Sequence, residues 1–204
     1  MIPVLDELSH RYHIEGRPLE SVTQVIKSVW PIKPTFQDAP KHILEHARHR
    51  GERVDYWVCE YARLGGNVDV DDDTDIVESV EFFDKWWNRV KPAYIDHQRM
   101  VWNEPLGVCG RFDLLLAIEG VATLIDVKRT HNEEQTWPIQ VGAYRDLYHH
   151  MPTGDQFHIS DIGVLHIHPR FKQGYIWRHY DTNACVDAWR NTVAFWQTVS
   201  RLSK

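Results

Sequence analysis

The sequence is poor in cysteine. Only three occur in 204 residues, Cys59, Cys109 and Cys185, and they lie far apart with no C-x-x-C pair among them. This spacing excludes a disulfide framework, and it does not indicate a zinc or iron–sulfur site. We therefore expect a protein of a reducing compartment.

Long apolar runs are absent as well. No apolar stretch approaches the roughly 18 residues of a membrane span. The N-terminus contains no basic segment followed by an apolar one, so a secretory leader is not expected. We expect a soluble, intracellular protein.

Positive charge is not in excess: 23 lysines and arginines stand against 29 aspartates and glutamates, which gives a formal net charge of -6. A protein that only binds nucleic acid is more often basic, whereas an enzyme can be acidic overall and still contain a locally positive groove. The sequence also lacks a G-x-S-x-G elbow, a phosphate-binding P-loop and a Cys-His signature. These absences disfavour nucleophilic catalysis and nucleotide hydrolysis.

The chain is long enough for one well-buried domain and short for two, since it has 204 residues of which 43% are hydrophobic. We expect a single domain over residues 1–204. Its parts are an N-terminal arm with helices (1–92), a core that carries the chemistry (about 93–180) and a C-terminal helix (about 183–202).

Capping and turn residues predict the elements around this core. Ser21 and Gln24 match a capping box that starts a short helix, and Gly65-Gly66 ends a long one. Apolar spacing predicts the rest. The expected elements are a hairpin or extended arm at 10–20, helices at 21–29, 39–64, 76–90 and from 136, strands at 162–168 and 175–180, and a helix at 183–202.

Two charged segments accompany the long helix. Its exposed face carries Arg48, Arg50 and Arg53 with three histidines, and these form either a solvated face or a stripe that tracks phosphates. The acidic run at 69–75 lacks the central glycine and the final glutamate of a calcium loop. We expect it to be a solvated linker whose carboxylates favour the start of the next helix.

The most informative stretch is a predicted hairpin in the middle of the chain. Two apolar runs, 108–118 and 121–128, are separated only by a Glu-Gly pair, which is typical of a two-residue turn. Counting outward from that turn places Asp113 directly opposite Asp126. Lys128, two residues further along, then shares their face.

A bulge would shift this register by one residue and move Asp126 to the other face. The unshifted register is favoured because it gathers a mainly apolar set on the opposite face, as a packed sheet requires. That set is Phe112, Leu114, Leu116, Val121, Thr123, Ile125 and Val127.

The placement of two negatively charged carboxylates opposite each other on paired strands needs a physical explanation. Their repulsion destabilises a sheet by about 0.2–1 kcal/mol, and by more when they are partly buried. A divalent cation between them converts this repulsion into attraction, and oxygen ligands suit Mg²⁺ or Mn²⁺. A neighbouring Lys128 then stabilises an anionic transition state, as in metal-assisted phosphodiester hydrolysis. The alternative is that Asp113 or Asp126 is an ordinary ion-pair partner of Lys128 or Arg111.

Three motifs of this chain resemble those of the PD-(D/E)XK nuclease superfamily, and within it the RecB-like exonucleases common in phages. They are Gly110-Arg111-Phe112-Asp113, Ile125-Asp126-Val127-Lys128 followed by Thr130, and Gln140-Val141-Gly142-Ala143-Tyr144, which matches the Q-x-x-x-Y motif of that branch. The resemblance implies an α/β fold with a central mixed β-sheet flanked by helices, a restriction-endonuclease-like αβββαβ core.

The resemblance also implies roles for individual residues. Asp113 and Asp126 would bind the metal together with the main-chain carbonyl of Val127, and Lys128 would orient the attacking water. Gln140 and Tyr144 would contact DNA and brace the site. Arg111, within the first motif, is a further candidate DNA contact.

The chain departs from the family pattern at three places. Where the branch usually has a metal-binding histidine in the long helix, soon after a glycine, this chain has Asp55, which is either a ligand or a surface aspartate. Glu104 is the nearest candidate for an upstream metal-binding glutamate, although Gln98 lies closer to its usual position. Arg129 stands between Lys128 and Thr130, where it either binds phosphate or lies in solvent.

These observations predict a Mg²⁺- or Mn²⁺-dependent DNA exonuclease of phage-type recombination or DNA processing, located in the cytoplasm of a bacterium or phage-infected cell. Two alternatives are a catalytically silent member that binds DNA or protein, and a structure- or site-specific endonuclease. By analogy with phage relatives, the expected partners are DNA, a single-strand annealing protein and further copies of the chain.

Overall fold

The computed structural model describes residues 3–6, 11–30, 40–66, 68–151 and 157–202. The chain forms strands and helices in the order β1 Val4–Asp6, β2 Arg11–Ile14, β3 Arg17–Ser21, α1 Val22–Val29, α2 Lys41–Leu64, α3 Thr74–Val90, β4 Ala93–His97, β5 Met100–Asn103, β6 Val108–Arg111, β7 Leu114–Ile118, β8 Val121–Lys128, α4 Trp137–His150, β9 Asp161–Ile167, β10 Tyr175–Tyr180 and α5 Thr182–Leu202.

Within the described residues the strands form two mixed sheets. The first has the order β1-β2-β3-β6-β5, with β3 and β6 parallel, and the second has the order β10-β9-β8-β7-β4, with β8 and β9 parallel. Apart from β5 and β6, which belong to the first sheet, the elements α3, β4, β7, β8, α4 and β9 occur in the expected αβββαβ order around the second sheet. The predicted α/β class is confirmed. The hairpin expected at 10–20 forms as β2 and β3, but its joining with β1, β5 and β6 into a separate sheet was not indicated by sequence patterns.

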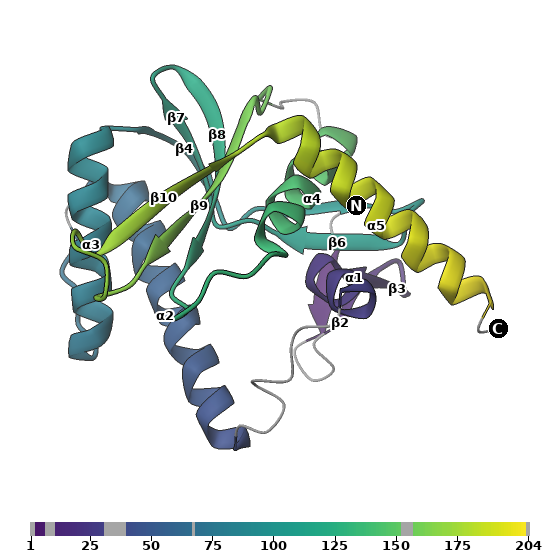
Figure 1. Cartoon of the computed structure of the whole chain (residues 1–204), viewed down its shortest axis with the longest axis horizontal. Helices are drawn as coiled ribbons and strands as arrows, with labels where there is room; N and C mark the ends of the chain where they lie inside the picture. Colours follow the sequence, from purple (N-terminus) through teal and green to yellow (C-terminus); the bar gives the residue numbers. More distant parts are fainter. Residues whose placement is uncertain (1–2, 7–10, 31–39, 67, 152–156, 203–204) are drawn as a thin grey trace.

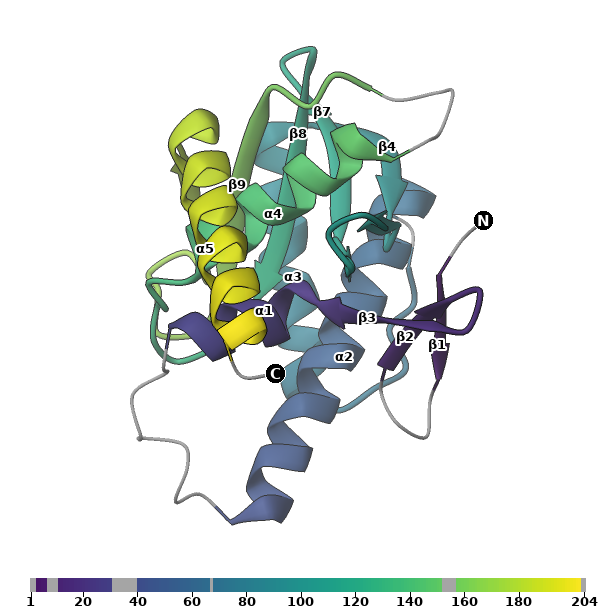
Figure 2. The same cartoon turned by 90° about the vertical axis from the view of Figure 1, so that its right-hand side faces the viewer.

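Helices cover both faces of the second sheet (Figure 1). On one face α2 and α3 pack against Leu114, Leu116 and Ile125 in one apolar core. On the other face α4 packs against Leu115 and Leu124 in a second core, and α5 crosses α4 and α1 and packs against both on that side (Figure 2). Helices thus exclude water from both faces of the central strands. This explains why both faces of those strands carry apolar side chains.

The β7–β8 hairpin forms as the Glu-Gly pair predicts. Glu119 and Gly120 both have positive φ, 51° and 82°, which is the backbone that a tight primed turn requires. Ile118 pairs with Val121, and the ladder continues to Leu114 opposite Ile125. The unshifted register is therefore confirmed over the paired residues.

The apolar run 108–118, predicted as one strand, is divided between the two sheets. Residues 108–111 form β6 in the first sheet, and residues 114–118 form β7 in the second. Phe112, at the crossing, packs in the core beneath α4 rather than with Leu114 and Leu116, so its predicted place on their face was wrong. An apolar run cannot reveal such a crossing, because both sheets bury the same residue types.

Capping residues set the helix boundaries as predicted. At the start of α1 the Ser21 hydroxyl accepts from Gln24 N at 3.1 Å, while Gln24 Oε1 accepts from Ser21 N at 2.9 Å. Helix α2 ends at Gly65, whose left-handed φ of 67° suits a residue without Cβ. None of the helices in the described ranges combines the length and the apolar character that crossing a bilayer requires.

Candidate functional site

The candidate site lies where β8 extends beyond the paired end of its neighbour β7. The β7–β8 ladder ends at Leu114 opposite Ile125, whereas β8 continues beside β9 to Lys128. The main-chain N–H of Val127 donates instead to Asp113 Oδ2, at 2.7 Å. Asp113 thus takes the place of a strand partner, which brings its carboxylate beside Asp126.

Asp126 and Lys128 form a close buried ion pair. Lys128 Nζ lies 2.6 Å from Asp126 Oδ2, and Asp126 is 2% exposed. The directional requirements of a hydrogen bond at Oδ2 are not met, so the contact is an ion pair rather than an aligned hydrogen bond. Burial opposes the charge on Lys128, but the negative charges of Asp126 and Asp113 outweigh it and raise the lysine pKa. Lys128 therefore stays protonated.

Asp55 on α2 joins this cluster. Burial, and then the charge of Asp113, raises the pKa of Asp55 well above its ordinary range. Burial, and then the charge of Asp126, raises the pKa of Asp113 to about 7, against the opposing effect of Lys128. In both cases a neighbouring negative charge disfavours the ionised form of the acid, as between neighbouring buried acids. The sequence left open whether Asp55 is a metal ligand or a surface aspartate. In the structure it faces the predicted pair, Asp113 and Asp126.

A pocket of about 240 Å³ opens beside these acids, between α2 and the end of β8. Its wall carries one carboxylate and three cationic side chains, which makes it suited to an anionic group. It is lined by Ala47, Arg50, Gly51, Asp55, Val127, Lys128, Arg129 and Thr130.

Gln140 and Tyr144 point the same way from α4, as their spacing predicts. Gln140 Nε2 donates to the Tyr144 hydroxyl at 2.8 Å. Burial, and then the charge of Asp126, raises the pKa of Tyr144, so its hydroxyl stays protonated beside the acids. A Cβ on Gly110 would lie 2.6 Å from Tyr144 Cε1, so the glycine of the first motif makes room for this ring.

The donor set fits a hard divalent cation, although its members are not arranged as a finished centre. In the described part of the chain, no three histidine, cysteine, aspartate or glutamate side chains group together as a metal site. The charges of Asp113 and Asp126 nevertheless raise the pKa of Asp55, and the charge of Asp126 raises the pKa of Asp113, which is the repulsion that a cation relieves. Carboxylate oxygens are the ligands that Mg²⁺ and Mn²⁺ prefer.

Other predicted residues lie elsewhere or have other partners. Glu104 lies in the turn between β5 and β6, at the far end of β6 from Asp113, and its carboxylate pairs with Arg17 at 3.1 Å. The structure therefore does not bring it to the acids. Arg111 is exposed at the near end of β6, where its charge opposes the rise in the pKa of Asp113. Gln98 contributes its main-chain N–H, which donates to the Asp113 carbonyl at 2.8 Å.

Two aspartates of the acidic run 69–75 form ion pairs with arginines of α2, whereas Asp69, Asp71 and Asp73 are exposed. Arg53 Nη2 lies 2.5 Å from Asp72 Oδ2, which also accepts from Trp57 Nε1 at 2.7 Å. Arg48 pairs with Glu52 within the helix. Asp72 and Asp75 therefore tether α2 to α3, which corrects the interpretation of the run as a solvated linker at these two residues, while its exposed aspartates agree with it.

His166 supports the segment that follows Lys128. It is fully buried on β9, and its Nε2 lies 2.6 Å from the carbonyl of Thr130, an acceptor, so Nε2 carries the proton. Nδ1 is buried without a hydrogen-bond partner among the described residues, and burial lowers the pKa of His166. A lowered histidine pKa contributes stability that is fully present above the unfolded-state value, about 6.5, and is lost as pH falls through the folded-state value.

We therefore expect the protein to lose stability on acidification through His166, with a slope of at most about 1.4 kcal/mol per pH unit for one proton. His166→Gln, which cannot titrate, should remove that contribution. Urea unfolding at pH 7.5 and 5.5 measures it for both proteins. An equal loss of stability on acidification in the two proteins would contradict the assignment.

Comparisons with known proteins place these residues in a known fold. No family model and no curated protein matches the sequence. Among solved structures, the alkaline exonuclease LHK-Exo of Laribacter hongkongensis superposes with a TM-score of 0.50 and 8% identity, over 90% of this chain and 88% of that one. LHK-Exo in complex with dAMP gives a TM-score of 0.49 and 10% identity, over 91% and 89% of the two chains. The similarity to the first of these structures shows that the chain shares the overall fold of an alkaline exonuclease.

Proposed function

We propose that the protein is a Mg²⁺- or Mn²⁺-dependent deoxyribonuclease that hydrolyses phosphodiester bonds at DNA ends. The observation that carries the proposal is the convergence of Asp113, Asp126 and Lys128 at the open end of β8, beside a pocket with cationic walls. Lys128 is the ion-pair partner of Asp126, as the alternative interpretation requires, but one ammonium group cannot neutralise Asp113 and Asp55 as well, and an uncompensated buried charge is costly.

The residues that would hold the cation are Asp113, Asp126 and Asp55, with the main-chain carbonyl of Val127. A bound divalent cation supplies an acidified water molecule and polarises a phosphate oxygen. The side chains of the protein position the phosphate and the water. Because they are already held in place in a buried site, they need little reorganisation when the reaction occurs.

Lys128 is the main protein donor in this scheme. Its ammonium group stays charged beside the carboxylates, and while it is ion-paired with Asp126 it can donate a hydrogen bond to a phosphate oxygen or to the attacking water. The water oxygen bonds to phosphorus as the bridging P–O bond breaks, which leaves a phosphate on one fragment and a hydroxyl on the other. The Gln140–Tyr144 hydrogen bond braces the wall against which the DNA lies.

The preference for DNA ends is supported by the fold that the chain shares with an alkaline exonuclease. The intact acid and lysine set favours an active enzyme over a silent binding module. A single-strand annealing protein and a ring of several copies stay predictions drawn from the family resemblance.

A substrate panel tests the proposal. Linear and circular duplex DNA and single-stranded DNA are incubated with the protein in Mg²⁺, Mn²⁺ or EDTA. We expect loss of linear DNA only, in either metal and not in EDTA. Binding without cleavage in both metals would favour the silent module, and nicked circles would favour an endonuclease.

A further inference from the structure

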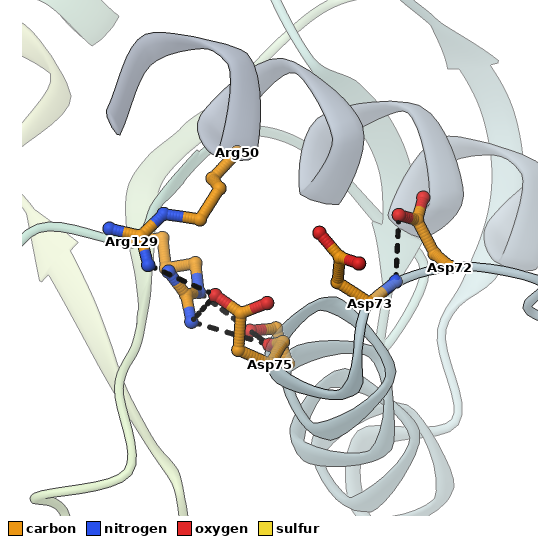
Figure 3. Close-up of polar contacts among 6 residues, drawn as sticks. Arg50, Asp72, Asp73, Asp75 and Arg129 are labelled. Atoms are coloured by element: carbon orange, nitrogen blue, oxygen red, sulfur yellow. Dashed lines mark hydrogen bonds and ion pairs between the residues drawn. The ribbon is translucent and has the colours of Figure 1, made fainter. Parts of the chain in front are cut away.

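One carboxylate is shared by two arginines at the pocket wall (Figure 3). Asp75 Oδ2 lies 3.2 Å from Arg50 Nη1 and 3.1 Å from Arg129 Nη2. The two guanidinium groups come from α2 and from the residue after β8, and Asp75 lies in the first turn of α3. A single side chain thus joins three segments that lie far apart in sequence.

Arg129 is held on α3 by further contacts. Its Nε donates to Ser79 Oγ at 2.8 Å, and its Nη2 donates to the Asp75 carbonyl at 3.3 Å. Its side chain is 15% exposed, although the pocket wall includes the residue. Because Arg129 directly follows Lys128, these contacts fix the end of β8 and the backbone that carries the lysine.

Arg50 is held less completely. Its Nη1 pairs with Asp75, whereas its Nε is buried without a hydrogen-bond partner in the described part of the chain. Arg50 lines the pocket about 1.4 turns before Asp55 on the same helix. Asp75 therefore ties the wall that carries Asp55 to the wall that carries Lys128.

The shared carboxylate also sets the charge at the pocket. Two guanidinium groups and one carboxylate leave one net positive charge at this part of the wall. An arginine released from its carboxylate presents a planar fork that matches phosphate, and such charge-assisted contacts are about twice as strong as neutral ones. Without the Asp75 carboxylate, Arg50 would lose its ion pair and Arg129 would keep only its contacts with Ser79 and the main-chain carbonyl of residue 75. Both guanidinium groups would then be able to bind DNA phosphates in geometries that do not align them for hydrolysis.

We infer that Asp75 is a positioning residue of the nuclease site, which holds Arg50 and Arg129 on α3 so that Lys128 and Asp55 face each other across the pocket. The inference rests on the proposed function. It predicts opposite effects on binding and on turnover, because removing the carboxylate frees positive charge and loosens the alignment of the two walls.

Asp75→Asn tests this directly, since it removes the charge and keeps the size and the main-chain contacts. In EDTA, binding of a fluorescent DNA oligonucleotide should tighten several-fold, and the slope of log K against log salt should steepen by about 1 to 2, as one or two further phosphates are bound. In Mg²⁺, kcat should fall by about tenfold or more, because small misplacements in an active site are costly. KM should fall as well.

Asp73→Asn is the matched control. Asp73 is exposed two residues away, and its carboxylate has no ion-pair or hydrogen-bond partner among the described residues, so this variant makes the same change in net charge without touching the arginines. Ser79→Ala is the second variant, because it removes one Arg129 contact and keeps the Asp75 charge. Ser79→Ala should slow cleavage without tightening DNA binding.

The outcomes separate the two levels of the account. Tighter binding with slower turnover in Asp75→Asn, and not in the control Asp73→Asn, supports the inference. If Asp75→Asn does not fold, slower turnover in Ser79→Ala without tighter binding supports it. Equal effects of Asp73→Asn and Asp75→Asn, or wild-type binding and turnover in Asp75→Asn and Ser79→Ala, would overturn it while leaving the nuclease intact. A wild-type protein that neither binds nor cuts DNA would overturn the proposed function and this inference with it.

Discussion

Asp113→Asn should abolish cleavage and leave the metal-free protein at least as stable as the wild type. The asparagine can still accept from Val127 N, so the local structure is retained. Loss of the carboxylate removes a proposed metal ligand, and we expect cleavage to fall by about 10³-fold or more.

The stability of this variant follows from the direction of the pKa shift. The folded-state pKa of Asp113 is raised to about 7, above its unfolded-state value near 3.9, so the folded protein binds more protons between these values. The contribution of Asp113 to stability in EDTA therefore decreases as pH rises from about 4 to 7, opposite in sign to that of His166, and ionised Asp113 costs stability at pH 8. An uncharged side chain removes this cost.

Thermal unfolding in EDTA at pH 8 and cleavage of linear DNA in Mg²⁺ measure the two effects. Asp69→Asn, at an exposed aspartate of the linker, is the control and should change neither. Normal cleavage by Asp113→Asn would remove the residue from the site. Loss of cleavage together with a lower unfolding midpoint would mean that the carboxylate is structural.

Gly142→Ala should destabilise the fold by about 2–3 kcal/mol or more, as forced overpacking does. A Cβ at this position would lie 2.4 Å from the main-chain carbonyl oxygen of Cys185, at the start of α5. Backbone atoms cannot move aside without shifting the helix. Gly142 lies in the same motif as Gln140 and Tyr144, so α4 presents its polar pair to the site and its glycine to α5.

Gly51→Ala is the control for this prediction. Gly51 is also helical, and a Cβ added there would meet no atom within 4 Å. At this position we expect a gain of about 0.5–1 kcal/mol from helix propensity. Urea unfolding of both variants measures the contrast, and equal stability of the two would contradict the close contact between α4 and α5.

Local patterns predicted the hairpin well, because turn chemistry and strand alternation act between near neighbours. The Glu-Gly turn predicts Ile118 opposite Val121, as the structure shows. The same register predicts Asp113 beside Asp126, and the hydrogen bond from Val127 N to the Asp113 carboxylate holds it there. The capping box of α1 and the glycine stop of α2 were predicted for the same reason.

Contacts between distant segments were not predictable in this way. The acidic run 69–75 is hydrophilic whether it is solvated or bound, and only the packing of α2 on α3 shows that Asp72 and Asp75 meet arginines. The division of the run 108–118 between two sheets is likewise invisible in its composition. Asp55 was an open alternative because helix periodicity gives a residue's face but not what that face meets.

The most direct test of the central claim is an anomalous difference map from crystals soaked in Mn²⁺. Soaks of the wild type and of Asp126→Asn would be compared at the Mn absorption edge. The account predicts a strong peak among Asp113, Asp126 and the Val127 carbonyl in the wild type, and its loss in the variant. A wild-type map at saturating Mn²⁺ with no peak there, or with its peak on other residues, would contradict it.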